Sequence, residues 1–325
     1  MAKYRHQLPQ LTGKMFLTDG GIETTLIFHE GLDLPHFAAF DLLKDAAGNE
    51  ALQKYFRTYA ALARKYEVGF ILESATWRAN PDWAAKLGYS DEQLAALNRK
   101  AIESLCTIRA EYENEKSPMV ISGCVGPRGD GYIPSSVMSA GEAQRYHSMQ
   151  IDTFSETQAD LVTAITMNYA EEAIGIALAA QSAQIPVIIS FTVETDGRLP
   201  TGQMLRNAIE AVDAATDDFP AYYMINCAHP RHFREVLMTG ELWLRRIRGL
   251  RANASAKSHA ELNDSTELDE GDPEDLGRHY SDLVRQLENL NVLGGCCGTD
   301  HRHVEEICKA CLAVPRKEFL HVFPG

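Results

Sequence analysis

The sequence has few of the features that mark membrane-bound, secreted or nucleic-acid-binding proteins. No apolar run approaches the ~20 residues that a helix needs to cross a bilayer. The N-terminal stretch MAKYRHQLPQ contains no apolar signal segment. Basic residues are outnumbered, 31 against 45 acidic ones, and the net charge of -14 argues against non-specific binding to nucleic acid or anionic membrane. We expect a cytoplasmic protein that acts on small molecules; the sequence leaves its oligomeric state open.

A glycine-rich dinucleotide loop is also missing. A doubly wound sheet, the competing fold, would place a GxGxxG motif after its first strand, and none occurs here. Instead, β-rich runs alternate with helical patterns, such as those over 52–66 and 276–290, in about eight units. This number, with a length of 325 residues, favours a single (β/α)8 TIM barrel over residues 1–325. The expected strands begin at Met15, Phe70, Met119, Ala159, Pro186, Tyr222, Arg246 and Asn291, the fourth and seventh having weaker patterns.

One acidic segment interrupts the alternation. Residues 255–275, SAKSHAELNDSTELDEGDPED, are poor in large apolar side chains and predict a solvated loop insertion after the seventh strand. Strand-to-helix loops form the catalytic face of a barrel. The segment is therefore either a mobile insertion or a flap over an active site.

The seven cysteines are an odd number in a chain without a secretion signal. This favours reduced thiols, metal ligands or catalytic groups over a disulfide framework. Cys308 and Cys311 form a C-x-x-C, a spacing that zinc sites use, but they also lie on one face of a predicted helix. We favour core packing for both, and likewise for Cys106 and Cys124, because cysteine is often a small buried hydrophobe.

Three other cysteines come at the ends of predicted strands. Cys227 ends the sixth strand in YYMINC, and Cys296 and Cys297 end the eighth in NVLGGCCGT. Neighbouring side chains on a regular strand point to opposite faces, so adjacent cysteines meet only where the strand breaks, which the flanking glycines permit. Three thiolates at one barrel rim match a catalytic zinc with an open fourth position. Nearby candidates for a fourth ligand, for which surface or capping roles are commoner, are His229, His301 and His303.

Three motifs carry a resemblance to a known family. DGGIETTL after the first strand, INC at the sixth and GGCCG at the eighth resemble the homocysteine S-methyltransferase family over nearly the whole chain. The resemblance implies a TIM barrel whose zinc is held by Cys227, Cys296 and Cys297. It also implies that Asp19 helps to hold the amino-acid acceptor, although an Asp-Gly-Gly sequence can also simply form a turn.

The implied chemistry is methyl transfer to a thiolate. Zinc lowers the pKa of a bound thiol, which is about 8.5 in water, and so supplies a thiolate at neutral pH. The sulfur then attacks a methyl group on a sulfonium, an ammonium or a similar donor, most directly turning homocysteine into methionine. Glu73 and Thr76, in ESATWRAN after the second strand, are expected near this substrate. Trp77 either binds a cationic donor through its ring or packs the barrel.

One position departs from the family. Most relatives read like ETIP at the end of the fourth strand, where the glutamate grips the amino group of the acceptor. Here Ile165 takes that place and only Thr166 matches, so Thr166 is kept as a substrate-binding candidate. Either another acid, Asp19 or Glu73, takes over the amino group, or the acceptor is a different thiol or selenol; we favour homocysteine.

Two other classes of function stay open. A zinc lyase or hydrolase on the same barrel would place water in the open position, but no H-E-x-x-H occurs. A non-catalytic descendant would bind metal or thiols as a sensor or store, which the intact cysteines and Asp19 disfavour.

Overall fold

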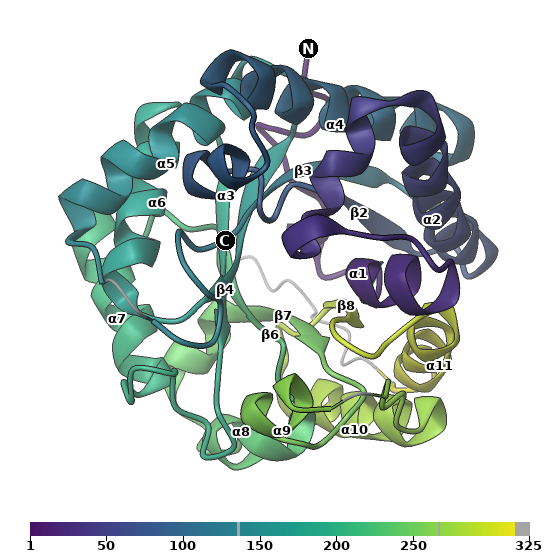
Figure 1. Ribbon diagram of the computed structural model, residues 1–325. Helices are drawn as coiled ribbons and strands as arrows, with labels where there is room; N and C mark the ends of the chain where they lie inside the picture. Colours follow the sequence, from purple (N-terminus) through teal and green to yellow (C-terminus); the bar gives the residue numbers. More distant parts are fainter. Residues whose placement is uncertain (135–136, 266, 316–325) are drawn as a thin grey trace, which may run out of the picture.

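The computed structural model describes residues 1–134, 137–265 and 267–315. Within them, parallel strands β1 to β8 pair in chain order and close into a barrel, β1 pairing with both β2 and β8 (Figure 1). The TIM-barrel prediction is confirmed, including the two strands with weaker patterns. The strands are β1 Phe16–Leu17, β2 Gly69–Glu73, β3 Met119–Val125, β4 Leu161–Met167, β5 Val187–Thr192, β6 Tyr222–Asn226, β7 Ile247–Ala252 and β8 Val292–Gly295.

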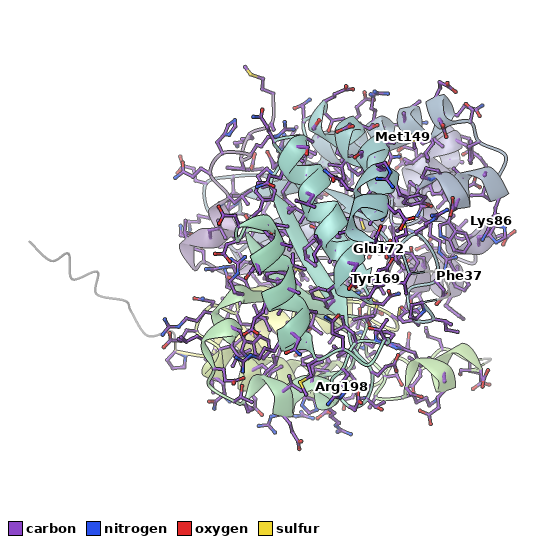
Figure 2. The ribbon with its side chains drawn as sticks, turned by 90° about the vertical axis from the view of Figure 1, so that its left-hand side faces the viewer. Phe37, Lys86, Met149, Tyr169, Glu172 and Arg198 are labelled. Atoms are coloured by element: carbon purple, nitrogen blue, oxygen red, sulfur yellow. A yellow bond between two sulfur atoms is a disulfide. The ribbon has the colours of Figure 1, made fainter. Side chains whose placement is uncertain are left out.

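A ring of helices surrounds the strands, and the view turned by 90° shows α6 and its neighbours running along the outside of the sheet (Figures 1 and 2). Polar side chains fix some helix starts: Ser90 and Ser139 each cap a helix in a box with the residue three positions on. The main outer helices are α2 Ala46–Lys65, α4 Asp91–Tyr112, α5 Ala140–Ser155, α6 Ala170–Ser182, α7 Leu205–Thr216, α8 Pro230–Leu237, α10 Pro273–Gln286 and α11 His301–Leu312.

The loops contain short helices. Sequence periodicity did not predict them, because few of them complete two turns. They are η1 Pro9–Thr12, α1 Ile22–Thr24, η2 Thr25–His29, η3 Pro35–Phe37, η4 Ala39–Lys44, α3 Pro81–Lys86, η5 Leu242–Arg246 and α9 His259–Asn263. Among the described helices, none is long and apolar enough to cross a bilayer.

The barrel interior has two layers of different chemistry. An apolar cluster fills its amino-terminal half: Leu8, Phe16, Ile71, Val120, Leu161, Ile188, Tyr222, Met224 and Val292. Because side chains alternate along a strand, the residue two positions further on points the same way. Those residues form a buried polar layer toward the carboxyl ends of the strands: Glu73, Ser122, Thr163, Ser190, Asn226 and, on β7, Arg251.

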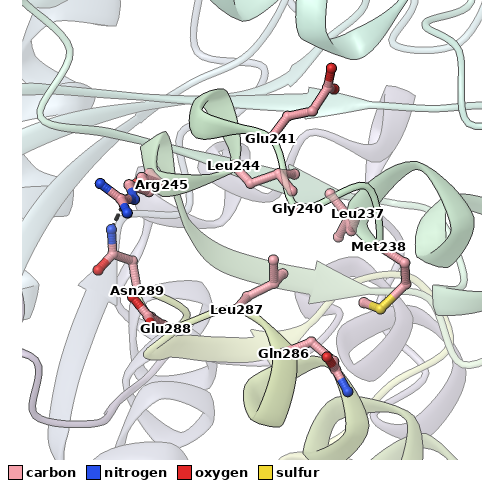
Figure 3. A pocket seen from close by; sticks show the side chains of 10 residues that line it. All are labelled: Leu237, Met238, Gly240, Glu241, Leu244, Arg245, Gln286, Leu287, Glu288 and Asn289. Carbon is pink, nitrogen blue, oxygen red and sulfur yellow. Dashed lines mark hydrogen bonds between the residues drawn. The ribbon is translucent and has the colours of Figure 1, made fainter.

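A small hollow of about 280 Å³ lies at the amino-terminal end of the barrel (Figure 3). The ends of α8 and α10 and the residues that lead into β7 and β8 line it. Its described lining contains neither cysteine nor histidine, so it offers no thiolate or imidazole ligand. The candidate site therefore lies at the other end.

Candidate active site

A cavity of about 670 Å³ opens at the carboxyl ends of the strands. Its wall contains Cys227, Cys296 and Cys297 together with Asp19 and Glu73. This is the face of a barrel where catalytic groups gather, because the strand-to-helix loops meet there.

The three cysteine sulfurs converge on one point. All three Sγ atoms lie within 4.8 Å of one another, and Cys227 Sγ lies 4.0 Å from Cys297 Sγ. Cys227 and Cys296 are joined by a disulfide with their Cα atoms 5.4 Å apart. Zn–S bonds of about 2.3 Å in a tetrahedron place sulfurs about 3.8 Å apart. Once reduced, the three side chains therefore fit the ligand set of a single zinc ion.

The regular strands end just before the cysteines: β8 ends at Gly295, so Cys296 and Cys297 lie in the turn that follows it. Cys227, directly after β6, has a φ of 54°, in the left-handed region that non-glycine residues seldom adopt. Gly294 and Gly295 serve close packing instead, since a Cβ on them would lie 1.9 Å from Thr18 Oγ1 and 2.0 Å from Thr299 Oγ1. Of the flanking glycines, Gly298 has the positive φ, 78°.

None of the candidate histidines joins the sulfurs. His229 caps α8 by accepting a hydrogen bond from the Arg231 N–H, and His303 is buried against Asp300. His301 is exposed at the start of α11. Among the described residues no fourth histidine, cysteine or acid completes the group, which leaves one position of a tetrahedral ion for another ligand.

The remaining cysteines agree with core packing. Cys308 and Cys311 are buried on the inner face of α11, Cys106 packs partly buried against the core, and Cys124 is buried at the cavity wall. The C-x-x-C spacing therefore reflects helix packing, which separates these thiols from the site.

Asp19 lines the cavity, but both of its carboxylate oxygens are engaged. Oδ1 accepts a 2.6 Å hydrogen bond from Arg251 Nη2, and Oδ2 accepts one of 2.9 Å from the Tyr55 hydroxyl. The Arg251 and Asp19 side chains are 7% and 4% exposed, so this is a buried ion pair. The single negative charge of Asp19 is thus balanced within the protein.

Two further carboxyl groups face the cavity. Burial raises the pKa of Glu73 to about 7, although Arg251 Nη1, 3.7 Å from Glu73 Oε2, acts in the opposite direction. Glu73 Oε1 has no hydrogen-bond partner. Burial also raises the pKa of Glu23 to about 7, with Asp19 adding to the rise. Both acids therefore change charge close to neutral pH, and sequence reasoning missed Glu23.

Thr76 and Thr166 have different surroundings. Thr76 is fully buried, and its hydroxyl donates to the Cys124 carbonyl, so it lies outside the cavity wall. Thr166 and Ile165 do line the cavity. Thr166 has a φ of 67° and is held by Asn226, whose Oδ1 accepts from its N–H and whose Nδ2 donates to its hydroxyl.

The aromatic side of the cavity already contains a cation. The Arg78 guanidinium lies 5.0 Å from the Trp77 ring centre and 4.0 Å from that of Trp83. The Trp77 N–H donates to the Ile165 carbonyl at 3.2 Å. Trp77 therefore packs the wall and binds an internal cation, which weakens the case that it receives a cationic donor.

The acidic segment contributes to the cavity wall. His259, at the start of α9, packs against Tyr132 with tilted rings whose centres are 4.3 Å apart, and its Nε2 lies 2.5 Å from the Cys227 carbonyl oxygen. Leu262, Leu268 and Asp269 line the same space. The segment thus contacts the residues of the cysteine cluster across the cavity.

Sequence reasoning also missed Arg251 and Asn226. The signal for Arg251 was present in the sequence, because a charged residue at an inward position of a barrel strand is unusual and indicates a functional role. Asn226 had a weaker signal, since it stood within the INC motif only as the neighbour of a ligand.

The fold and the site define a class: a TIM-barrel protein with three convergent cysteines in its carboxyl-end cavity. The sequence profile of the homocysteine S-methyltransferase family matches residues 16–311. The chain therefore belongs to that family and is an S-methyltransferase.

Individual relatives are distant. Selenocysteine Se-methyltransferase of Brassica oleracea var. italica is 23% identical, over 93% of this chain and 90% of its own length. The oxidized form of the homocysteine methyltransferase MmuM from Escherichia coli superimposes with a TM-score of 0.73 at 19% identity, covering 94% of this chain and 99% of that one. Its metallated form gives 0.68 at 18% identity, covering 91% and 96%. These structural likenesses support the fold.

Proposed function

We propose that this protein is a zinc-dependent methyltransferase that moves a methyl group from a sulfonium, ammonium or similar donor to a thiolate. The observation that carries the proposal is the convergence of Cys227, Cys296 and Cys297 on one cavity without a fourth described protein ligand. An open position suits a substrate sulfur. A bound zinc would lower the pKa of that thiol and keep its sulfur nucleophilic at neutral pH.

The residues of the chain then have separate tasks. The three cysteines hold the ion, and the cavity wall aligns donor and acceptor, which is the main requirement of a direct displacement. In the transfer, the bond between sulfur and methyl forms as the bond between the methyl and the donor breaks, and its electron pair stays on the donor. Before this step the thiol releases its proton to solvent.

Glu73 is the acid we assign to the amino group of homocysteine. Ile165 cannot neutralise an ammonium group, and the Asp19 carboxylate is held by Arg251 and Tyr55. The Oε1 atom of Glu73, which is buried at the cavity wall and unpartnered, is free to accept a hydrogen bond. With homocysteine as acceptor, the product is methionine.

A selenol acceptor is the second candidate. The Brassica relative is named as a selenocysteine Se-methyltransferase, and the three-cysteine cluster suits a soft selenolate as well as a thiolate. The choice between the two acceptors depends on the groups around the sulfur cluster rather than on the cluster itself.

The proposed zinc site favours a reducing compartment. A disulfide between Cys227 and Cys296 and a zinc thiolate site exclude each other, so activity requires reduced thiols. We therefore infer a cytoplasmic location, where thiols are kept reduced. The net charge of -14 supports small-molecule substrates rather than nucleic acid or anionic membrane as partners.

The acidic insertion, predicted over residues 255–275, ends in the structure at Asp272, the N-cap of α10, and we assign the part before α10 as a flap. His259 and Leu262 lie over the same cavity as the cysteines, so closure of the segment would exclude water from the reacting sulfur. Slower limited proteolysis within the segment when a thiol is bound supports a flap, and equal cleavage with and without thiols supports a passive insertion.

Methyl transfer measured by mass spectrometry tests the function. Zinc-loaded, reduced protein is mixed with homocysteine and, in separate reactions, with a methyl sulfonium, a quaternary ammonium and a methylated pterin. We expect methionine from at least one donor, and none from a Cys297→Ala variant under the same conditions. The absence of a methylated thiol or selenol product with every donor contradicts the proposal. Hydrolysis of a substrate in place of methyl transfer identifies the zinc hydrolase alternative.

A further inference from the structure

The inner end of the cavity contains one permanent positive charge. The Arg251 side chain is 7% exposed, lines the cavity and lies between the two strands that carry the cysteines. Its backbone carbonyl accepts the Cys227 N–H at 3.0 Å, and its Nε donates to the carbonyl of Gly295, the residue before Cys296. A ligand whose sulfur reaches the cysteine cluster is therefore brought next to this guanidinium.

The hydrogen-bonding capacity of Arg251 is incompletely used. Nη2 binds Asp19, but Nη1 has no hydrogen-bond partner and is buried. Its nearest acid is Glu73 Oε2 at 3.7 Å, beyond hydrogen-bonding distance. A buried guanidinium N–H without a partner is unfavourable unless a ligand completes it. The natural complement of a guanidinium is a carboxylate.

The acids around Arg251 do not compete for that role. Asp19 is already paired, and Ile165 offers an apolar surface. Glu73 and Glu23 are carboxyl groups whose burial raises the pKa of each to about 7, so neither provides a fixed negative charge at neutral pH. The buried group left for a ligand at the inner end is therefore the Nη1 donor of Arg251.

From this geometry we propose that Arg251 is the specificity-determining residue of the acceptor site and binds a carboxylate, so that the acceptors are short thiol or selenol carboxylic acids. The proposal rests on the proposed methyl transfer and refines its acceptor. It makes the carboxylate of homocysteine essential and the amino group secondary. An acid that lacks the amino group is then a substrate, whereas an aminothiol that lacks the carboxylate is a poor one.

Three thiols separate these contributions: homocysteine, 4-mercaptobutanoate, which lacks the amino group, and 3-aminopropane-1-thiol, which lacks the carboxylate. Their binding to zinc-loaded, reduced protein is measured by titration calorimetry, without any methyl donor. We expect 4-mercaptobutanoate to bind within about tenfold of homocysteine, and the aminothiol to bind about 10- to 100-fold more weakly, as for the loss of a charge-assisted hydrogen bond. Stronger binding of the aminothiol than of 4-mercaptobutanoate overturns the proposal.

Variants assign the effect to the guanidinium. Arg251→Gln is expected to weaken 4-mercaptobutanoate about 10- to 100-fold and to leave the aminothiol unchanged or bound more tightly, because Asp19 is then uncompensated. Arg248→Gln, on the same strand but outside the cavity lining, is the matched control and should change neither. Equal weakening of all three thiols by Arg251→Gln indicates a structural role and overturns the proposal.

A second variant avoids leaving a buried aspartate unpaired. The double change Arg251→Gln with Asp19→Asn removes both partners of the ion pair and should also lose the preference for the carboxylate. Retention of that preference in the double variant overturns the assignment. If the protein binds zinc and methylates aminothiols but not thiol acids, the proposed methyl transfer stands and the role of Arg251 is refuted. A protein that binds none of the three thiols loses both.

Discussion

At the amino-terminal end of the barrel interior, Ile71, Val120 and Ile188 pack in an apolar cluster, whereas two positions further along the same strands stand Glu73, Ser122 and Ser190. Burial of the apolar side chains in the first layer stabilises the folded state. The second buries a carboxyl group and a guanidinium, which costs free energy unless each finds a partner. Because the strands are shared, the difference comes from side chains alone, and it indicates that the carboxyl end is built for binding at the expense of stability.

The largest effect is expected from changes at the carboxyl end of the barrel, where the cysteines lie. Replacing Cys227, Cys296 or Cys297 singly with alanine should remove most of the zinc and lower the rate of methyl transfer by at least ~100-fold. The reason is that each change removes one of the three proposed zinc ligands. The melting temperature of the metal-free protein should change little, since these side chains lie at a rim. Metal analysis, a methyl-transfer assay and thermal melting measure the three quantities.

Cys308→Ser and Cys311→Ser are the controls for this series. They should keep full zinc occupancy and lose some stability, because each places a hydroxyl in the packed face of α11. Full zinc content in a Cys296→Ala, Cys297→Ala double variant would refute the assigned metal site.

The reverse experiment targets the apolar layer. Ile188→Ala should lower the free energy of unfolding by about 2–5 kcal/mol, because it opens a cavity in a fully buried cluster. Zinc stoichiometry should be unchanged. Leu242→Ala, at a side chain that is 75% exposed, is the control and should cost less than about 0.5 kcal/mol. Urea unfolding checks both, and a loss of zinc in Ile188→Ala would show that the two layers are coupled.

A pH series tests the cost of the buried acids. Burial raises the pKa of Glu73 from 4.5 to about 7, so between these values the folded protein holds a proton that the unfolded chain has released. The stability of the metal-free protein should therefore fall as the pH rises from 4.5 to about 7 and then level off. Glu73→Gln should reduce that fall by up to about 3 kcal/mol.

Urea unfolding at pH 5 and pH 8 measures the difference. Glu23→Gln should remove a second part of the fall, since burial raises its pKa to a similar value. An unchanged pH dependence in both variants would mean that neither carboxyl is desolvated as the structure indicates.

The smallest effect is expected from a substitution of one residue in the cavity wall, Ile165. Ile165→Glu places an acid at the position where the family resemblance implies a glutamate, and should improve discrimination for homocysteine over 4-mercaptobutanoate by about tenfold, because an ammonium group gains a partner. Ile165→Gln, which is polar but uncharged, should have less effect. The ratio of kcat/KM values for the two thiols is the measurement. A wild-type enzyme that already prefers homocysteine strongly, and loses turnover in Ile165→Glu, would contradict the idea of a weakened amino-group site.

Sequence patterns predicted the strands and the sulfur cluster because both leave local signals. Buried parallel strands are continuous apolar runs, and three cysteines at strand ends stand out by position. The pairing of Arg251 with Asp19 left no such signal, because these residues lie 232 positions apart and meet only when β7, β8 and β1 close the barrel. The burial of Thr76 was equally hidden, since its hydroxyl turns toward the Cys124 carbonyl of the next strand.

The amide of Asn226 has a consequence for how this enzyme can change over generations. It holds the backbone of Thr166 in place and leaves the side chain at position 165 outside its grip. Residue 165 can therefore be exchanged without moving the loop or the neighbouring Cys227. The cysteine cluster can then stay unchanged while the preference for an acceptor changes one substitution at a time, which makes this barrel mouth evolvable.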